Sequence, residues 1–204
     1  MSVRVGRRPG RPVGGLHVVD RELVLDAAER VIRRDGSGVS LEAIALEAGV
    51  TKPVVYARVG GRAEMANALA HRLSDRMVAS GGEALSAVRD EQAMVAALIK
   101  ANLITVAEHR ELFLYVTGGT ADDSPLQKLY LAEQSATPLA HQIAAWRAQQ
   151  GYDTAVAVPW AYAVIGMLQM TSLWWLTAAD QTVDELAEQL SELLWSGLAG
   201  PRDQ

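Results

Sequence analysis

Apolar residues recur at helical spacing along nearly the whole chain, and this pattern decides the fold class. Between Asp20 and Gly36, for example, they are separated by three, one and three positions, as on one face of an α-helix. These residues are Val24, Ala27, Ala28 and Val31. No segment alternates at period two for long enough to indicate a sheet. The sequence therefore predicts an all-α protein whose first helix begins after Asp20 and ends at Gly36.

The stretch "VSLEAIALEAGVTKPVVY", residues 39–56, reads as two short helices joined at Gly49. Ser40 is placed to cap the first, and Val39 and Ile44 flank it as a hydrophobic staple. Isolated helices below roughly 12 residues are marginal in water. Two helices this short persist only if they pack on each other and on a third, so the stretch predicts a helix-turn-helix.

The second short helix is expected to begin at Thr51, with Pro53 in its first turn, where a missing N–H costs little. A helix-turn-helix leaves the outer face of this helix free, and such a face fits the major groove of DNA. The residues expected on it are Thr51, Lys52, Val54, Val55, Tyr56 and Arg58. The alternative is an ordinary helical hairpin within a bundle.

These residues also carry a family resemblance. "VSLEAIALEAGVTKPVVYARVGGRAEMANAL" resembles the N-terminal DNA-binding domain of the TetR family of transcriptional regulators, and the match spans residues 20 to about 75. Two departures stand out: Val59 where the family usually has Phe, and Gly61-Arg62-Ala63 where Ser-Lys-Glu is common. The resemblance implies that Thr51 and Tyr56 bind phosphates, and that Lys52 and Pro53, with their neighbours Val54 and Val55, face the bases.

Side-chain chemistry agrees with those implied roles. Hydroxyl and phenol groups donate to phosphates, lysine donates to guanine O6 or N7, and proline or valine contacts a thymine methyl. A fourth helix is expected over about 62–79. The helix starts at Ser40, Thr51 and Arg62 also offer backbone N–H groups to phosphates.

Charge is distributed unevenly along the chain. Residues 1–80 contain 13 Lys/Arg and 9 Asp/Glu, whereas residues 81–204 contain 6 and 15. The segment "GRRPGRP" resembles the core of an AT-hook, and its Arg7, Arg8 and Arg11 suit an A·T-rich minor groove. The alternative for this segment is a disordered, solubilising tail. We therefore divide the chain into a flexible basic arm (1–19), a helix-turn-helix domain (20–80) and a helical ligand-binding and dimerisation domain (81–204).

In the third part the periodicity predicts helices near 90–108, 109–117, 124–149, 154–179 and 183–198. The helix over 124–149 is expected to be bent or broken near Pro138. Thr182 and Glu185 predict a capping box. Residues 154–179 carry no charge and are long enough to span a bilayer. Polar residues inside this run and flanking Asp153 and Asp180 favour a buried subunit interface instead. We expect a homodimer through 154–179 and 183–198, as the TetR resemblance also implies.

Large apolar and aromatic side chains in this domain predict a cavity for a small lipophilic effector. The candidate lining residues are Phe113, Tyr115, Trp146, Met167, Met170, Thr171 and Trp174. The alternative is that these residues simply fill the core.

The absence of cysteine excludes disulfides and thiol chemistry and fits a cytoplasmic setting. The four scattered histidines and the lack of a nucleophile elbow or phosphate-binding loop argue against an enzyme, a metal site or a cofactor. We predict a ligand-responsive regulator, a repressor more often than an activator, that binds a palindromic operator as a dimer. The alternative is a helical membrane-associated or scaffold protein whose 154–179 segment spans a bilayer; a helical enzyme is a less favoured one.

Overall fold

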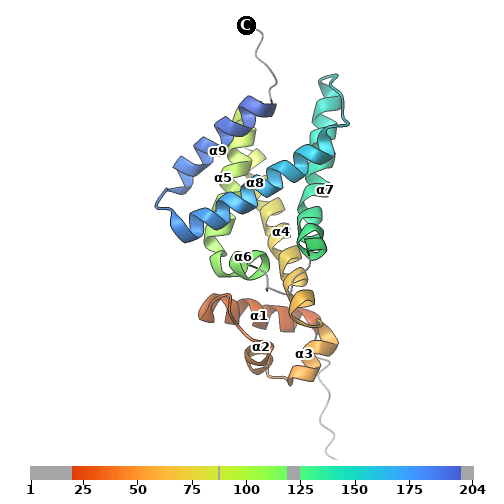
Figure 1. Ribbon diagram of the computed structural model, residues 1–204, viewed down its shortest axis with the longest axis vertical. Helices are drawn as coiled ribbons and strands as arrows, with labels where there is room; N and C mark the ends of the chain where they lie inside the picture. The colour runs from red at the N-terminus through yellow and green to blue at the C-terminus, as the bar shows by residue number, and fades with distance from the viewer. Residues whose placement is uncertain (1–19, 87, 119–124, 199–204) are drawn as a thin grey trace, which may run out of the picture.

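The described residues of the computed structural model, 20–86, 88–118 and 125–198, fold as nine α-helices, which confirms the predicted fold class. Figure 1 shows α1 to α3 at one end of the molecule, with α4 leading from them into the remaining helices. The bounds are α1 Arg21–Asp35, α2 Leu41–Glu47, α3 Lys52–Arg58, α4 Arg62–Ser86, α5 Glu91–Glu108, α6 Arg110–Thr117, α7 Pro125–Gln149, α8 Ala157–Ala178 and α9 Val183–Leu198.

The starts and ends of the first three helices follow the local sequence signals. Ser40 Oγ accepts a hydrogen bond from the N–H of Ala43, as expected of a side-chain cap. Gly49 has a φ of 69° and turns the chain from α2 into α3. Asp20 and Thr51 stand at the predicted N-cap positions, but neither side chain makes a capping hydrogen bond. Thr51 is exposed to solvent.

Helix α4 is longer than the sequence predicted. The expected helix ended near residue 79, whereas α4 continues through Gly81 and Gly82 to Ser86. Gly81 is buried, and a Cβ added there would lie 3.1 Å from Leu98 Cδ2 of α5. The glycine therefore permits a close approach of two helices, and this packing offsets the poor helix propensity of glycine. With 25 residues, α4 forms a continuous rod of about 37 Å.

The end that holds α1 to α3 shares its core with the helices above it. Ile32, Ile44 and Leu69 are fully buried there, together with Leu112 and Phe113 of α6. Figure 1 shows α6 lying directly on α1. Helix α6 therefore provides part of the support on which the first three helices rest.

The remaining helices pack mainly as two pairs, α5 with α9 and α7 with α8. The predicted capping box is present at the start of α9: the Glu185 carboxylate accepts from the Thr182 N–H at 2.8 Å, and Thr182 Oγ1 accepts from the Glu185 N–H at 3.2 Å. Helix α7 continues without a break through Pro138. Among the described residues, no helix has the length and apolar character needed to cross a membrane.

Candidate nucleic-acid interface

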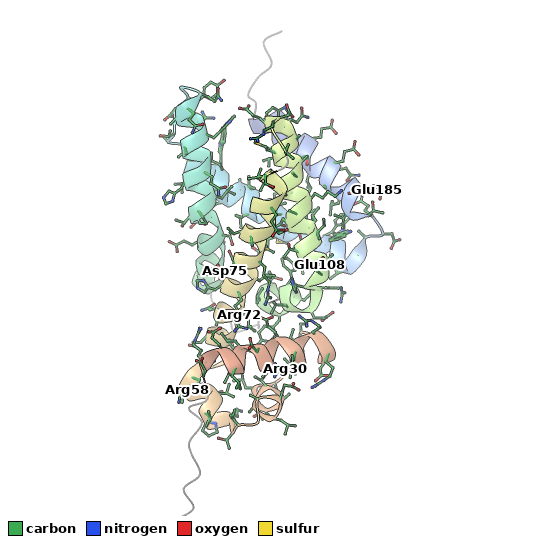
Figure 2. All side chains as sticks on the ribbon, turned by 180° about the vertical axis from the view of Figure 1, so that it is seen from behind. Arg30, Arg58, Arg72, Asp75, Glu108 and Glu185 are labelled. Carbon is green, nitrogen blue, oxygen red and sulfur yellow. The ribbon has the colours of Figure 1, made fainter. Side chains whose placement is uncertain are left out.

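Helix α3 exposes a compact polar and apolar face at the end of the molecule remote from α9. Thr51, Pro53 and Arg58 are exposed, and Tyr56 retains 49 % of its accessible surface. Figure 2 shows Arg58 at the outer edge of this end. Val54 is half-buried beside them. The structure thus brings together most of the side chains that the sequence placed on this face.

Val55 is a clear exception, and the prediction that it faces DNA is wrong. Its side chain is fully buried in the core beneath α3. Val59, one turn further along, is buried in the same core at the position where the family usually has phenylalanine. These two valines anchor the inner side of α3, which leaves its opposite side for a partner.

Arg62 also requires a correction. It begins α4 as predicted, but its guanidinium donates to the carbonyls of Val39 at 2.8 Å and Ser37 at 3.2 Å. The same group lies 4.7 Å from the centre of the Tyr115 ring. Burial raises the pKa of Tyr115, although the nearby guanidinium partly opposes that shift. The Arg62 side chain therefore ties the α1–α2 connection to α6 instead of lying on the outer face.

Lys52 is held by two neighbours on the outer face. Its Nζ forms an ion pair with Glu42 Oε1 of α2 and lies 5.9 Å from the centre of the Tyr56 ring. The contact with Glu42 was not predicted, because ten residues and a turn separate the two positions. Helical spacing alone gives no signal for such a pair.

Acidic side chains of the same domain neutralise most of its other cations. Arg72 of α4 contacts three carboxylates of α1, and Arg76 contacts one of these, Glu29, at 2.6 Å. Figure 2 shows Arg72 at the junction of α4 and α1. Arg30 and Arg34 both pair with Glu47 at 2.9 Å. These ion pairs hold α1 against α2 and α4 and leave few cations for an external anion.

The formal charges of residues 20–80 also balance one another. Residues 20–80 contain nine Lys/Arg and nine Asp/Glu, so the positive balance of the first 80 residues comes from the four arginines of residues 1–19. The predicted arm, with Arg7, Arg8 and Arg11, lies outside the described residues. Residues 20–80 therefore carry no net charge with which to attract a polyanion over a long distance.

The seven predicted effector residues lie in different environments. Phe113 and Tyr115 are buried in the core shared with α1 and α4, and Met167 packs on the α5–α9 cluster. Trp146 Nε1 donates to Glu91 Oε1 at 3.2 Å near the end of α7. The other three lie in the second half of α8: Thr171 is half-buried, whereas Met170 and Trp174 expose 65 % and 49 % of their surface.

A groove of ≈ 800 Å³ lies elsewhere, between α5 and α9. Alanines form much of its lining, and Asp90, Asp184, Glu188 and Glu192 stand along it with Lys100. Lys100 Nζ pairs with Asp184 Oδ1 at 2.6 Å. None of the seven predicted residues lines this groove.

Both α8 and α9 expose large apolar side chains. Met170 and Trp174 are one turn apart on α8, and Leu193 of α9 exposes 63 % of its surface. In Figure 1 α8 crosses the face turned toward the viewer, and α9 follows it at one edge. Large apolar side chains exposed in this way are typical of a protein–protein contact surface.

A short helix with an exposed outer face, braced by two others and joined to a larger helical body, is the arrangement of DNA-binding proteins of the helix-turn-helix class. The sequence matches the profile of bacterial regulatory proteins of the tetR family over residues 24–69, and that of the tetracyclin repressor-like C-terminal domain over residues 82–204. The chain belongs to the TetR family of transcriptional regulators. It is therefore a regulator and not an enzyme.

Individual relatives agree with this assignment. The chain is 30 % identical over 190 residues to an HTH-type transcriptional regulator of Mycobacterium tuberculosis H37Rv, covering 90 % of this chain and 80 % of the relative. The fold is similar to that of Thermus thermophilus FadR in complex with lauroyl-CoA, with a TM-score of 0.71, 17 % identity, and coverage of 90 % of this chain and 97 % of that one. It is also similar to Bacillus subtilis FadR in complex with stearoyl-CoA, with a TM-score of 0.66, 17 % identity, and coverage of 86 % and 98 %.

Proposed function

We propose that this regulator is a repressor that binds an inverted-repeat operator as a homodimer and leaves it when a lipophilic effector binds. Residues 20–80 bind the operator, and residues 81–204 bind the effector and hold the two copies together. The observation that carries the DNA-binding part is the outer face of α3. Thr51 and Tyr56 offer hydroxyl groups to phosphates, while Lys52 and Pro53, with Val54 beside them, are available to base edges.

The exposed apolar surface of α8 and α9 supports the homodimer. One recognition helix reads only a few base pairs, so a two-fold pair of α3 helices is needed to read half-sites about 34 to 36 Å apart. Met170, Trp174 and Leu193 are placed to pack against the same surface of a second copy. The shared core beneath α1 connects this body to the reading face, so effector binding and DNA binding oppose each other if they favour different arrangements of the dimer.

Selection of bound sequences from random duplex DNA tests the operator. We expect an enriched inverted repeat, because two identical α3 helices related by a two-fold axis read identical half-sites. The double substitution Lys52→Ala with Tyr56→Ala should lower affinity for the enriched sequence by roughly 10- to 100-fold. Val54 and Arg58 should then account for residual recognition. A wild-type protein that enriches no sequence at low salt would contradict the proposal.

The effector we propose is lipophilic and either neutral or cationic. The FadR structures contain acyl-CoA, but the charge of residues 81–204 disfavours that polyanionic group: six Lys/Arg stand against fifteen Asp/Glu. Three of those cations are already occupied: Lys100 by Asp184, Arg110 by Glu111, and Arg147 by the rings of Tyr152 and Trp160 at 5.3 and 4.6 Å.

An operator-release assay checks the effector class. Lauroyl-CoA is expected to leave the protein–operator complex intact at concentrations at which it remains monomeric in solution, whereas uncharged dodecyl compounds of matched chain length should release the operator. Release by lauroyl-CoA alone would overturn this part of the proposal.

A further inference from the structure

We propose that Glu42 is a specificity-determining residue that restrains Lys52 from binding phosphates indiscriminately. This inference rests on the proposed function and concerns how the same surface distinguishes an operator from other DNA. Its basis is the ion pair between Glu42 Oε1 and Lys52 Nζ on the outer face of the helix-turn-helix.

The position of the pair makes it part of the DNA-binding surface. Lys52 is the first residue of α3, and Glu42 lies in the first turn of α2. Both side chains remain accessible, at 42 % and 61 % of their surface. An ion pair this exposed adds little to folding stability, so its effect is to be sought in what the surface binds.

The pair also removes a mobile cation from the surface. Non-specific affinity for DNA grows with the number of phosphates that a protein neutralises, because each contact releases counterions. A lysine whose charge is already balanced by Glu42 contributes little to that release. Among the described residues, α3 then retains Arg58 as its cation outside any ion pair.

The same contact fixes where the lysine can donate. An ammonium group has three N–H donors, and Glu42 occupies one of them. The centre of the Tyr56 ring lies 5.9 Å from Nζ, so the ammonium group has two neighbours on this surface. The remaining donors can serve a base-edge acceptor at one fixed place without loss of the Glu42 contact. Recognition of guanine O6 or N7 therefore keeps the pair, whereas a shift toward a phosphate breaks it.

The hydrogen bond from Lys52 lowers the pKa of Glu42 below its ordinary value, and the bond to Glu42 raises the pKa of Lys52. A carboxyl group with a lowered pKa loses its charge only when the pH falls well below neutrality. Both groups are therefore charged at neutral pH, and a binding assay at pH 7 to 8 measures the intact pair.

The test is a double-mutant cycle of Glu42→Gln and Lys52→Ala, measured on the selected operator and on a scrambled duplex over a range of salt concentrations. Glu42→Gln alone should tighten binding to the scrambled duplex about 5- to 10-fold at low salt and steepen the salt slope by about one per protomer. Operator affinity should rise less, so that the operator-to-scrambled ratio falls. In the Lys52→Ala background, Glu42→Gln should have no larger effect than the control.

The control is Asp75→Asn, which removes one negative charge from an exposed position on α4 (Figure 2). Equal gains from Glu42→Gln with and without Lys52 would show that Glu42 merely repels phosphates, and would overturn the inference. An unchanged operator-to-scrambled ratio would overturn it as well. A wild-type protein that binds neither duplex would instead contradict the proposed function, so the two failures are distinguishable.

Discussion

Replacing Arg7, Arg8 and Arg11 together by alanine is expected to lower affinity for DNA about 100-fold at ~0.1 M salt. The reason is the internal neutralisation of the helix-turn-helix: residues 20–80 carry equal numbers of positive and negative side chains. Arg72 and Arg76 are occupied by α1, and Arg30 and Arg34 by Glu47. The arginines of residues 1–19 therefore supply most of the counterion release.

A salt titration of binding to the selected operator measures this effect. The slope of log affinity against log salt should become shallower by about two to three per protomer, since each lost phosphate contact contributes ~0.9. The matched control replaces the same three residues by lysine, which keeps the charge. It should preserve most of the slope but lose any preference for A·T-rich flanking sequence, because lysine lacks the planar guanidinium. A slope unchanged by the alanine variant would assign the phosphate contacts to the helices instead.

The double substitution Met170→Glu with Trp174→Glu should convert the proposed dimer to a monomer and weaken operator binding by two or more orders of magnitude. These side chains are one turn apart and exposed on α8, so a symmetric contact brings them against the same surface of the second copy. Glutamates there would place like charges in a desolvated contact. Each half-site would then be bound without the avidity that the second provides.

Light scattering gives the oligomeric state, and an electrophoretic shift assay gives the affinity. Val78→Glu is the matched control, because Val78 is also an exposed apolar residue, with 62 % of its surface accessible, but lies on α4. It should leave both the mass and the binding unchanged. A Met170/Trp174 variant that remains dimeric would place the interface on another surface.

Helix positions could be predicted wherever the signal is local. The Ser40 cap and the Thr182–Glu185 capping box involve residues only three positions apart, so their geometry follows from the sequence. The helix ends predicted at Gly36 and Gly49 also depend on local sequence, and both glycines have a positive φ. Predicted and observed bounds therefore agree closely for α1 to α3, α5, α6 and α9.

Tertiary contacts decided the features that the sequence left open or predicted wrongly. The sequence predicted that α4 ends near residue 79, but the fit of Gly81 against Leu98 of α5 keeps the helix intact beyond that point. Arg62 was expected near the DNA because a helix starts there, yet the carbonyls and the ring that its side chain contacts come from residues more than 20 positions away. Which neighbouring helix covers a given face is not encoded in the spacing of that face alone.

The same limit applies to the effector residues. Met170 and Trp174 share the apolar character of Phe113, but Phe113 is buried and the other two are exposed. A count of large side chains on a helix indicates that some surface must be covered, without indicating by what. On the outer face of α3 the prediction was better, because a seven-residue helix that rests on two others has one side left to expose.

The contribution of α6 to the core beneath α1 has a consequence for engineering chimeric sensors. A DNA-binding domain from another protein, fused to the C-terminal helices of this chain, would contact four side chains of α6 that pack against α1 and α4 here. These are Leu112, Phe113, Tyr115 and Val116. The residues of the fused domain that pack on α6 would have to be substituted to match them, or the fused segment would need to include α6. New operator preferences are more readily obtained by changing the exposed residues of α3 and leaving the contact between α6 and α1 unchanged.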